Sequence, residues 1–114
     1  MALDATRRRP LKVGLYLPTF DQPWVQTSAP RWSDLLDAAR HAEAVGFDSV
    51  WVPDHLNIRD DDGDGLGVWE GWSLLAALAA VTGRVELGSL VVCTAFRNPA
   101  LLAKMVDTVD QISG

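Results

Sequence analysis

Cysteine, basic charge and long apolar runs are all scarce in this chain. The single cysteine of the 114 residues, Cys93, excludes an internal disulfide and predicts a reducing, cytoplasmic location. The net charge of -5, with no basic stripe beyond residues 7–9, argues against a nucleic-acid partner. The first apolar run, residues 13–17, is too short for a secretory core, and the composition is not that of a membrane protein.

The composition that is present predicts one globular domain. Hydrophobic residues make up 48% of the chain and charged residues 22%, with five tryptophans. Residues 1–10 carry the basic cluster and are expected to form a disordered tail. Residues 11–114 are expected to form the domain.

Strand and helix patterns alternate through residues 11–114. Strands are expected at residues 11–17, 49–52 and 85–92, each followed by a helical pattern, at residues 32–45, 72–82 and 99–112. Gly46 and Gly83 are expected to end the first two helices, and Asn98 to cap the third. This alternation predicts an α/β fold in which the three strands are parallel, in the order one, two, three, with the helices on the outer face.

Two parallel architectures compete for this pattern. A dinucleotide-binding fold needs a glycine-rich turn directly after the first strand, but residues 18–21 are Pro-Thr-Phe-Asp and no glycine follows until Gly46. This favours a TIM (β/α)8 barrel. A complete barrel takes about 250 residues, so the prediction is a partial barrel, the first three βα units as an amino-terminal fragment.

Asp54 and His55 are the main candidate site residues. Pro53 ends the apolar strand at residues 49–52, so both side chains fall at its carboxyl end, where parallel α/β folds bind their ligands. A histidine can give or take a proton near neutral pH. In the alternative interpretation, Asp54 caps a turn and His55 fills a gap between loops.

Three segments together carry a family resemblance: LKVGLYLPTF, then HAEAVGFDSVWVPDHL, then the stretch from VWEGW to DQISG. Over residues 11–114 the chain resembles the bacterial luciferase-like monooxygenase family, which are TIM-barrel oxidoreductases. The resemblance implies a flavin- or deazaflavin-dependent oxidoreductase or monooxygenase that acts on a small-molecule substrate. Hydride would pass to or from a ring over the strand carboxyl ends. The deazaflavin coenzyme F-420 and FMN both remain open as cofactors.

The resemblance also implies residue roles. His55 would be the catalytic proton-transfer residue, and Asp54 would lie beside the coenzyme. Four further cofactor-binding residues are expected at the end of the third strand: Leu90, Val91, Cys93 and Thr94. There a bulge with a non-proline cis peptide at Leu90-Val91 would back the ring. Cys93 stands where the deazaflavin branch often has threonine, so Thr94 would make the polar contact. From the residues alone, Cys93 is interpreted as a small buried filler rather than a nucleophile.

Other motifs are given structural interpretations. Residues 60–65 match the first half of a calcium-loop pattern, but Gly71 stands where the pattern needs glutamate; a solvated acidic loop is expected, and no metal. Trp32 and Trp51 are expected in the core, and His41 on the surface. The remaining tryptophans lie in or beside the long loops and could line an apolar pocket, although packing is favoured: Trp24, Trp69 and Trp72.

A second function stays open. Three barrel units leave the first and third strands with unpaired edges, which are templates for self-association. The chain would then be a catalytically inactive barrel piece with a structural or assembly role, or a homo-oligomer.

Overall fold

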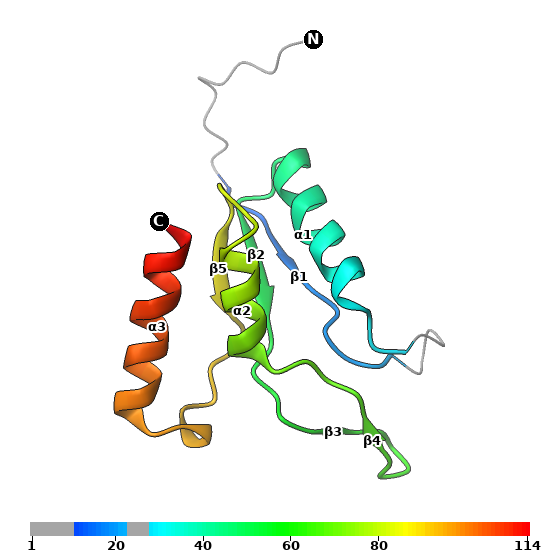
Figure 1. Cartoon of the computed structure of the whole chain (residues 1–114). Coiled ribbons are helices and arrows are strands. Elements are labelled where there is room, and N and C mark those ends of the chain that lie inside the picture. Colours follow the sequence, from blue (N-terminus) through cyan, green and yellow to red (C-terminus); the bar gives the residue numbers. More distant parts are fainter. Residues whose placement is uncertain (1–10, 23–27) are drawn as a thin grey trace.

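The computed structural model describes residues 11–22 and 28–114; the expected tail at residues 1–10 and Trp24 lie outside these ranges. The elements run in chain order (Figure 1): β1 (Gly14–Tyr16), α1 (Trp32–Val45), β2 (Ser49–Val52), β3 (Ile58–Arg59), β4 (Gly65–Leu66), α2 (Gly71–Ala79), β5 (Glu86–Ser89), a 3-10 helix (Thr94–Phe96) and α3 (Pro99–Ser113). Within the described ranges, no helix combines the length and apolar character that a membrane crossing requires.

The main sheet has three parallel strands in the order β1-β2-β5, as predicted. Trp51 in β2 stands opposite Tyr16 of β1 on one side and Gly88 of β5 on the other. Each outer strand pairs with β2 alone among the described residues. The sheet therefore has its two edges at the first and third predicted strands.

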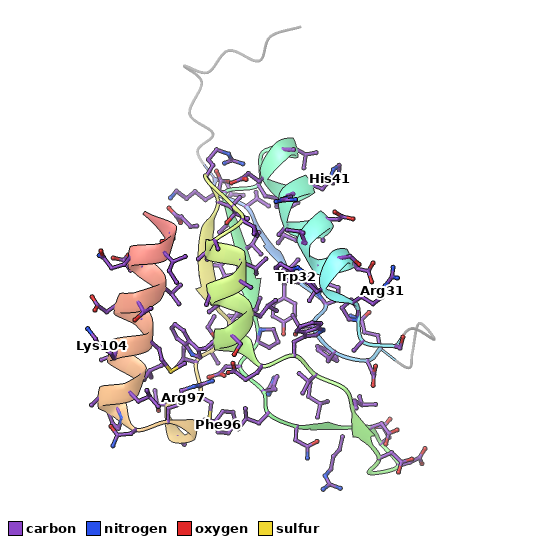
Figure 2. All side chains as sticks on the ribbon, in the orientation of Figure 1. Arg31, Trp32, His41, Phe96, Arg97 and Lys104 are labelled. Carbon is purple, nitrogen blue, oxygen red and sulfur yellow. The ribbon has the colours of Figure 1, made fainter. Side chains whose placement is uncertain are left out.

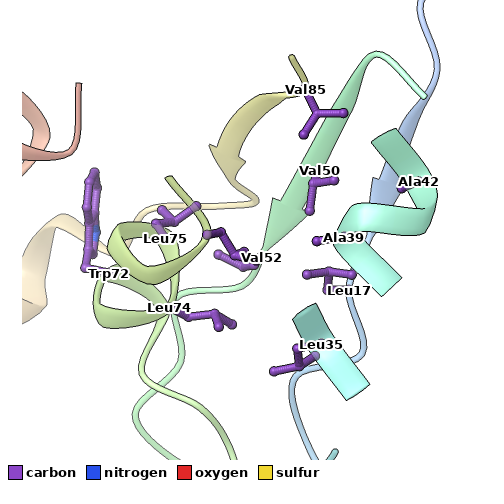
Figure 3. Packing of buried hydrophobic residues seen from close by; sticks show 11 residues of the cluster. Leu17, Leu35, Ala39, Ala42, Val50, Val52, Trp72, Leu74, Leu75 and Val85 are labelled. Atoms are coloured by element: carbon purple, nitrogen blue, oxygen red, sulfur yellow. The ribbon is translucent and has the colours of Figure 1, made fainter. Parts of the chain in front are cut away.

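Helices α1 and α2 cover one face of this sheet, and the core lies between these helices and the sheet (Figure 3). Val50 and Val52 are two residues apart in β2, so their side chains point to the same face of the sheet. Both are fully buried against the helices. Further buried members of this cluster are Leu17, Leu35, Leu75, Leu78 and Val85. Helix α3 packs against α2.

Trp51 points to the opposite face of the sheet, which no helix within the described ranges covers. Its indole Nε1 donates a hydrogen bond to Ser49 Oγ at 2.8 Å. A Cβ atom on Gly14 or Gly88 would lie within 3.0 Å of the indole, so the glycines on both neighbouring strands leave room for the ring. The expectation of a core tryptophan needs correction: Trp51 is half-buried on the uncovered face.

Most helix ends follow the predicted signals. Gly46 ends α1 in the left-handed region with φ of 95°, and Asn98 Oδ1 accepts the Ala100 N–H at the start of α3. The prediction for α2 ran too long, since the helix ends at Ala79 and Gly83 does not cap it. Instead a turn follows, in which the Thr82 N–H and hydroxyl both donate to Leu78 O.

The acidic loop expected at residues 60–65 lies in the β3–β4 hairpin. The acidic run makes its turn: Asp60 Oδ1 accepts the backbone N–H groups of Asp62 and Asp64, and Gly63 adopts φ of 86°. Asp60 therefore supplies side-chain hydrogen bonds that stabilise the turn between two short strands. This local chemistry was visible in the sequence, whereas strands of two residues leave no periodic pattern.

Candidate active site

The loops that carry the predicted site residues meet at the carboxyl ends of two strands. Asp54 and His55 follow β2, and residues 90–94 follow β5. Because β2 and β5 are adjacent and parallel, their carboxyl ends meet, and the Cys93 N–H donates to Asp54 Oδ2 at 2.9 Å. We call this region, formed by the loops that follow the strands, the carboxyl edge; it is distinct from the outer strands β1 and β5. β5 ends at Ser89, short of the predicted residue 92.

Asp54 is buried, with its side chain 0% exposed. Its carboxylate forms a two-pronged ion pair with Arg97, Nη1 to Oδ2 at 2.7 Å and Nη2 to Oδ1 at 2.8 Å. The hydrogen bonds from the Arg97 guanidinium lower the pKa of Asp54, and this effect outweighs the opposing effect of burial. Both carboxylate oxygens are therefore engaged with protein groups.

Arg97 also contacts the start of α2. Its Nη2 donates to Glu70 Oε1 at 2.6 Å, and Glu70 caps the helix by accepting the N–H groups of Trp72 and Ser73. Burial alone would raise the pKa of Glu70, but the hydrogen bonds from Ser73, Trp72 and Arg97 lower it to about 2. In Figure 2, Arg97 lies near the lower ends of α2 and α3, which are the amino-terminal ends of both helices. We call this set the Asp54–Arg97–Glu70 network.

The other predicted site residues face outward. His55 and Thr94 are exposed, and Cys93 is half-buried. Leu90 is 51% exposed and Val91 70% exposed. The peptide bond between these two is cis, as predicted. The carboxyl edge thus carries exposed apolar side chains and a hydroxyl on the loop after β5, and an exposed imidazole on the loop after β2.

A third loop reaches the same edge from β1. Thr19 is 1% exposed, and its Oγ1 has no hydrogen-bond partner among the described residues. The Trp69 N–H donates to Thr19 O at 2.9 Å, while the Trp69 indole donates to Pro30 O at 2.8 Å. Trp69 therefore joins the loop after β1 to the segment before α2, which agrees with the favoured packing role.

Three of these residues were missed by sequence reasoning: Arg97, Glu70 and Thr19. Glu70 stood in a capping position directly before a helical pattern, which was the available signal. Arg97 lies among loop residues, where an arginine is ordinarily solvated. Within residues 11–22 and 28–114, no three histidine, cysteine, aspartate or glutamate side chains are placed to hold a metal ion.

Fold and site define a class: an α/β protein with polar and exposed apolar residues gathered at the carboxyl ends of parallel strands. Residues 11–114 match the family model described as luciferase-like monooxygenase. The chain belongs to this family, and the resemblance drawn from its motifs is confirmed.

Curated relatives include both dehydrogenases and monooxygenases. The chain is 40% identical over 82 residues to an F420-dependent glucose-6-phosphate dehydrogenase of Amycolatopsis mediterranei, covering 70% of this chain and 24% of that protein. It is 30% identical over 121 residues to the pyrimidine monooxygenase RutA of Cronobacter turicensis, covering 98% of this chain and 31% of that protein.

The similar solved structures also include a dehydrogenase and a monooxygenase. An F420-dependent secondary alcohol dehydrogenase, in complex with an F420-acetone adduct, superposes with a TM-score of 0.70 at 29% identity, covering 89% of this chain and 28% of that one. The monooxygenase RslO1 from Streptomyces bottropensis superposes with a TM-score of 0.69 at 27% identity, covering 90% and 30%. The chain spans between a fifth and a third of the length of the relatives it matches.

Proposed function

We propose that the chain forms the first three βα units of a barrel oxidoreductase or monooxygenase that binds a flavin or deazaflavin ring over the carboxyl edge. The observation that carries this proposal is the meeting of the loops after β2 and β5, where Cys93 N lies 2.9 Å from Asp54 Oδ2. Coenzyme F-420 and FMN are both candidates, because the relatives include F420-dependent dehydrogenases and monooxygenases.

The residues at this edge fit such a ring. A planar aromatic ligand needs apolar surface with a few placed polar groups. Leu90 and Val91 offer exposed apolar side chains on the loop after β5, Thr94 is exposed on the same loop, and His55 is exposed on the adjoining loop after β2. Both oxygens of Asp54 already accept hydrogen bonds, so we assign it a supporting part in cofactor binding, in which it holds the backbone that carries Cys93.

The proposed chemistry divides between the ring and the protein. A bound flavin or deazaflavin exchanges hydride with the substrate. Residues 90–94 hold the ring in place, and His55 gives or takes the accompanying proton at its imidazole nitrogen, since histidine changes protonation near neutral pH. The partners of this site are then small molecules, and the single cysteine agrees with a cytoplasmic location.

The test is substitution of His55. In the protein with its barrel completed, His55→Ala is expected to reduce turnover by about 100- to 10,000-fold while the coenzyme dissociation constant stays within a few-fold. His41→Ala is the matched control, because His41 is also exposed but lies on α1, away from the carboxyl edge (Figure 2). Unchanged turnover in His55→Ala contradicts the role of His55. Absence of binding of both FMN and F-420 contradicts the function as a whole.

An assembly role is a second candidate, favoured by a specific observation. Strands β1 and β5 are the sheet edges, and α3 exposes an apolar stripe that includes Leu101, Val106 and Ile112, each between 45% and 55% exposed. Such surfaces favour association. Light scattering of the purified chain separates the two readings: an oligomer without coenzyme affinity supports assembly, and a monomer that binds coenzyme contradicts it.

A further inference from the structure

Arg97 joins three segments that are far apart in the sequence. Its guanidinium contacts Asp54 after β2 and Glu70 at the start of α2, and Arg97 itself lies between the 3-10 helix and α3. Asp54 in turn accepts the N–H of Cys93. A single side chain, 9% exposed, therefore connects the ends of two strands and the cap of one helix.

Resting on the proposed function, we infer that Arg97 is a positioning residue of the coenzyme site. It holds Asp54 in the orientation that receives the Cys93 N–H. It thereby sets the position of residues 90–94 relative to His55, which directly follows Asp54. Arg97 contacts neither coenzyme nor substrate in this role. It acts through Asp54.

The geometry requires arginine specifically. The two guanidinium nitrogens contact the two Asp54 oxygens at 2.7 and 2.8 Å, and Nη2 also reaches Glu70 at 2.6 Å. The planar guanidinium group can donate hydrogen bonds to both carboxylates at once, whereas the lysine ammonium is one compact charge at the end of a flexible side chain. Arg97→Lys therefore preserves the charge but cannot hold Asp54 from two sides.

The Cys93 end of residues 90–94 depends on this arrangement for its tie to β2; Val92 packs against the core, and Cys93 O accepts the Phe96 N–H within the following turn. Leu90 N–H donates to Val52 O at 2.7 Å, and Cys93 N–H to Asp54. The side chains of Leu90 and Val91 are both more than half exposed and add little packing. If Asp54 turns away, the Cys93 end of the segment loses its tie to β2.

The single cysteine offers a direct probe of this position. Cys93 is half-buried and is the sole thiol of the chain, so its rate of modification by a thiol reagent reports on this segment alone. In Arg97→Lys, we expect the rate of Cys93 modification to rise by about 10-fold, since a charge-assisted bond is lost. We expect the dissociation constant for F-420 or FMN, measured by fluorescence titration, to rise by about the same factor.

Arg84→Lys is the matched control. Arg84 also joins distant segments, donating from Nη2 to Glu43 O at 2.6 Å and to Phe47 O at 2.7 Å, but it does so at the other end of the strands. The rate of Cys93 modification is measured for both variants at several urea concentrations. Local opening gives a weak dependence on urea, and global unfolding a steep one.

The outcomes separate the two proposals. Faster, weakly urea-dependent modification in Arg97→Lys alone supports the positioning role. Equal rates in Arg97→Lys and the unchanged protein overturn it, as does an equal effect in both lysine variants; coenzyme binding by the unchanged protein would leave the proposed function standing. If the unchanged protein binds neither F-420 nor FMN, the proposed function fails, while the modification rates still decide whether Arg97 positions this segment.

Discussion

The two ends of the parallel sheet are both held by a carboxylate and an arginine, but in opposite environments. At the amino end, which we call the amino edge, Glu43 Oε1 accepts the N–H groups of Gly83, Arg84 and Val85, and the Arg84 guanidinium donates to backbone carbonyls. At the carboxyl edge, Asp54 and Arg97 bind each other directly. Glu43 and Arg84 at the amino edge thus bind backbone groups, whereas Asp54 and Arg97 at the carboxyl edge bind each other.

Burial explains the consequence of this difference. Arg84 is exposed, so water can replace its protein partners. The side chains of Asp54 and Arg97 are 0% and 9% exposed, so neither can lose its partner without leaving a desolvated charge. We therefore expect removal of a charged side chain to cost less stability at the amino edge than at the carboxyl edge, where the proposed site lies.

Removing each arginine tests this contrast with the largest expected effect. Arg97→Ala leaves the buried Asp54 carboxylate unpaired, which lowers the free energy of unfolding by about 3 to 5 kcal/mol. Arg84→Ala removes hydrogen bonds at an exposed site and costs about 1 kcal/mol. Urea denaturation measures both. Equal costs would show that the two edges do not differ in the way their burial indicates.

The second largest effect is expected from acid, which should lower the stability that the carboxyl edge contributes to the fold. The pKa values of Asp54 and Glu70 are lowered in the folded protein, that of Glu70 from 4.5 to about 2. Carboxylates with lowered pKa values stabilise the fold above their unfolded pKa, and this contribution is lost as pH falls towards the folded value. Stability is therefore expected to decline from about pH 4.5 towards pH 2.

Glu70→Gln sharpens the acid test. This variant should flatten the decline, because the amide does not titrate and can still accept a hydrogen bond. Thermal denaturation at several pH values measures it, with Asp37→Asn on the exposed side of α1 as control. A decline that is as steep in Glu70→Gln as in the unchanged protein would contradict the assignment to this network.

Substitutions of the residues that end or begin a helix at the two edges should lower the free energy of unfolding by similar amounts. Gly46 at the amino edge has φ of 95°, so Gly46→Ala forces a side chain into the left-handed region at about 1 kcal/mol. Asn98→Ala at the carboxyl edge removes the cap of α3 and costs about 1 kcal/mol. Chemical denaturation compares them. A much larger cost for Asn98→Ala would mean that the start of α3 supports more than its own helix.

The smallest effect is expected at an exposed ion pair of the amino edge. Lys12 Nζ lies 2.8 Å from Glu86 Oε1, but the two side chains are 73% and 67% exposed. Solvent screens such a pair. Lys12→Gln should leave the denaturation midpoint unchanged within error, and a clear loss would show that exposure alone does not decide which charges matter.

Much of the fold could be predicted because its signals are local. Short apolar runs located the three parallel strands and helical spacing located the helices that follow them, while Gly46 and Asn98 marked helix ends. The placement of Asp54 and residues 90–94 at one edge followed from strand direction alone. The two-residue strands β3 and β4 could not be predicted, because they are too short to show a period.

The amino-acid sequence by itself determined the order of the three parallel strands and three α-helices, and the family, since each depends on the residue types along a short stretch of chain. Tertiary structure alone decided how Asp54 is held. Arg97 lies 43 residues from Asp54 and 27 from Glu70 in the sequence, and nothing local specifies that these three side chains meet. Their contact exists because helix packing on the sheet brings the three loops together and excludes water. In that environment, opposite charges must satisfy one another.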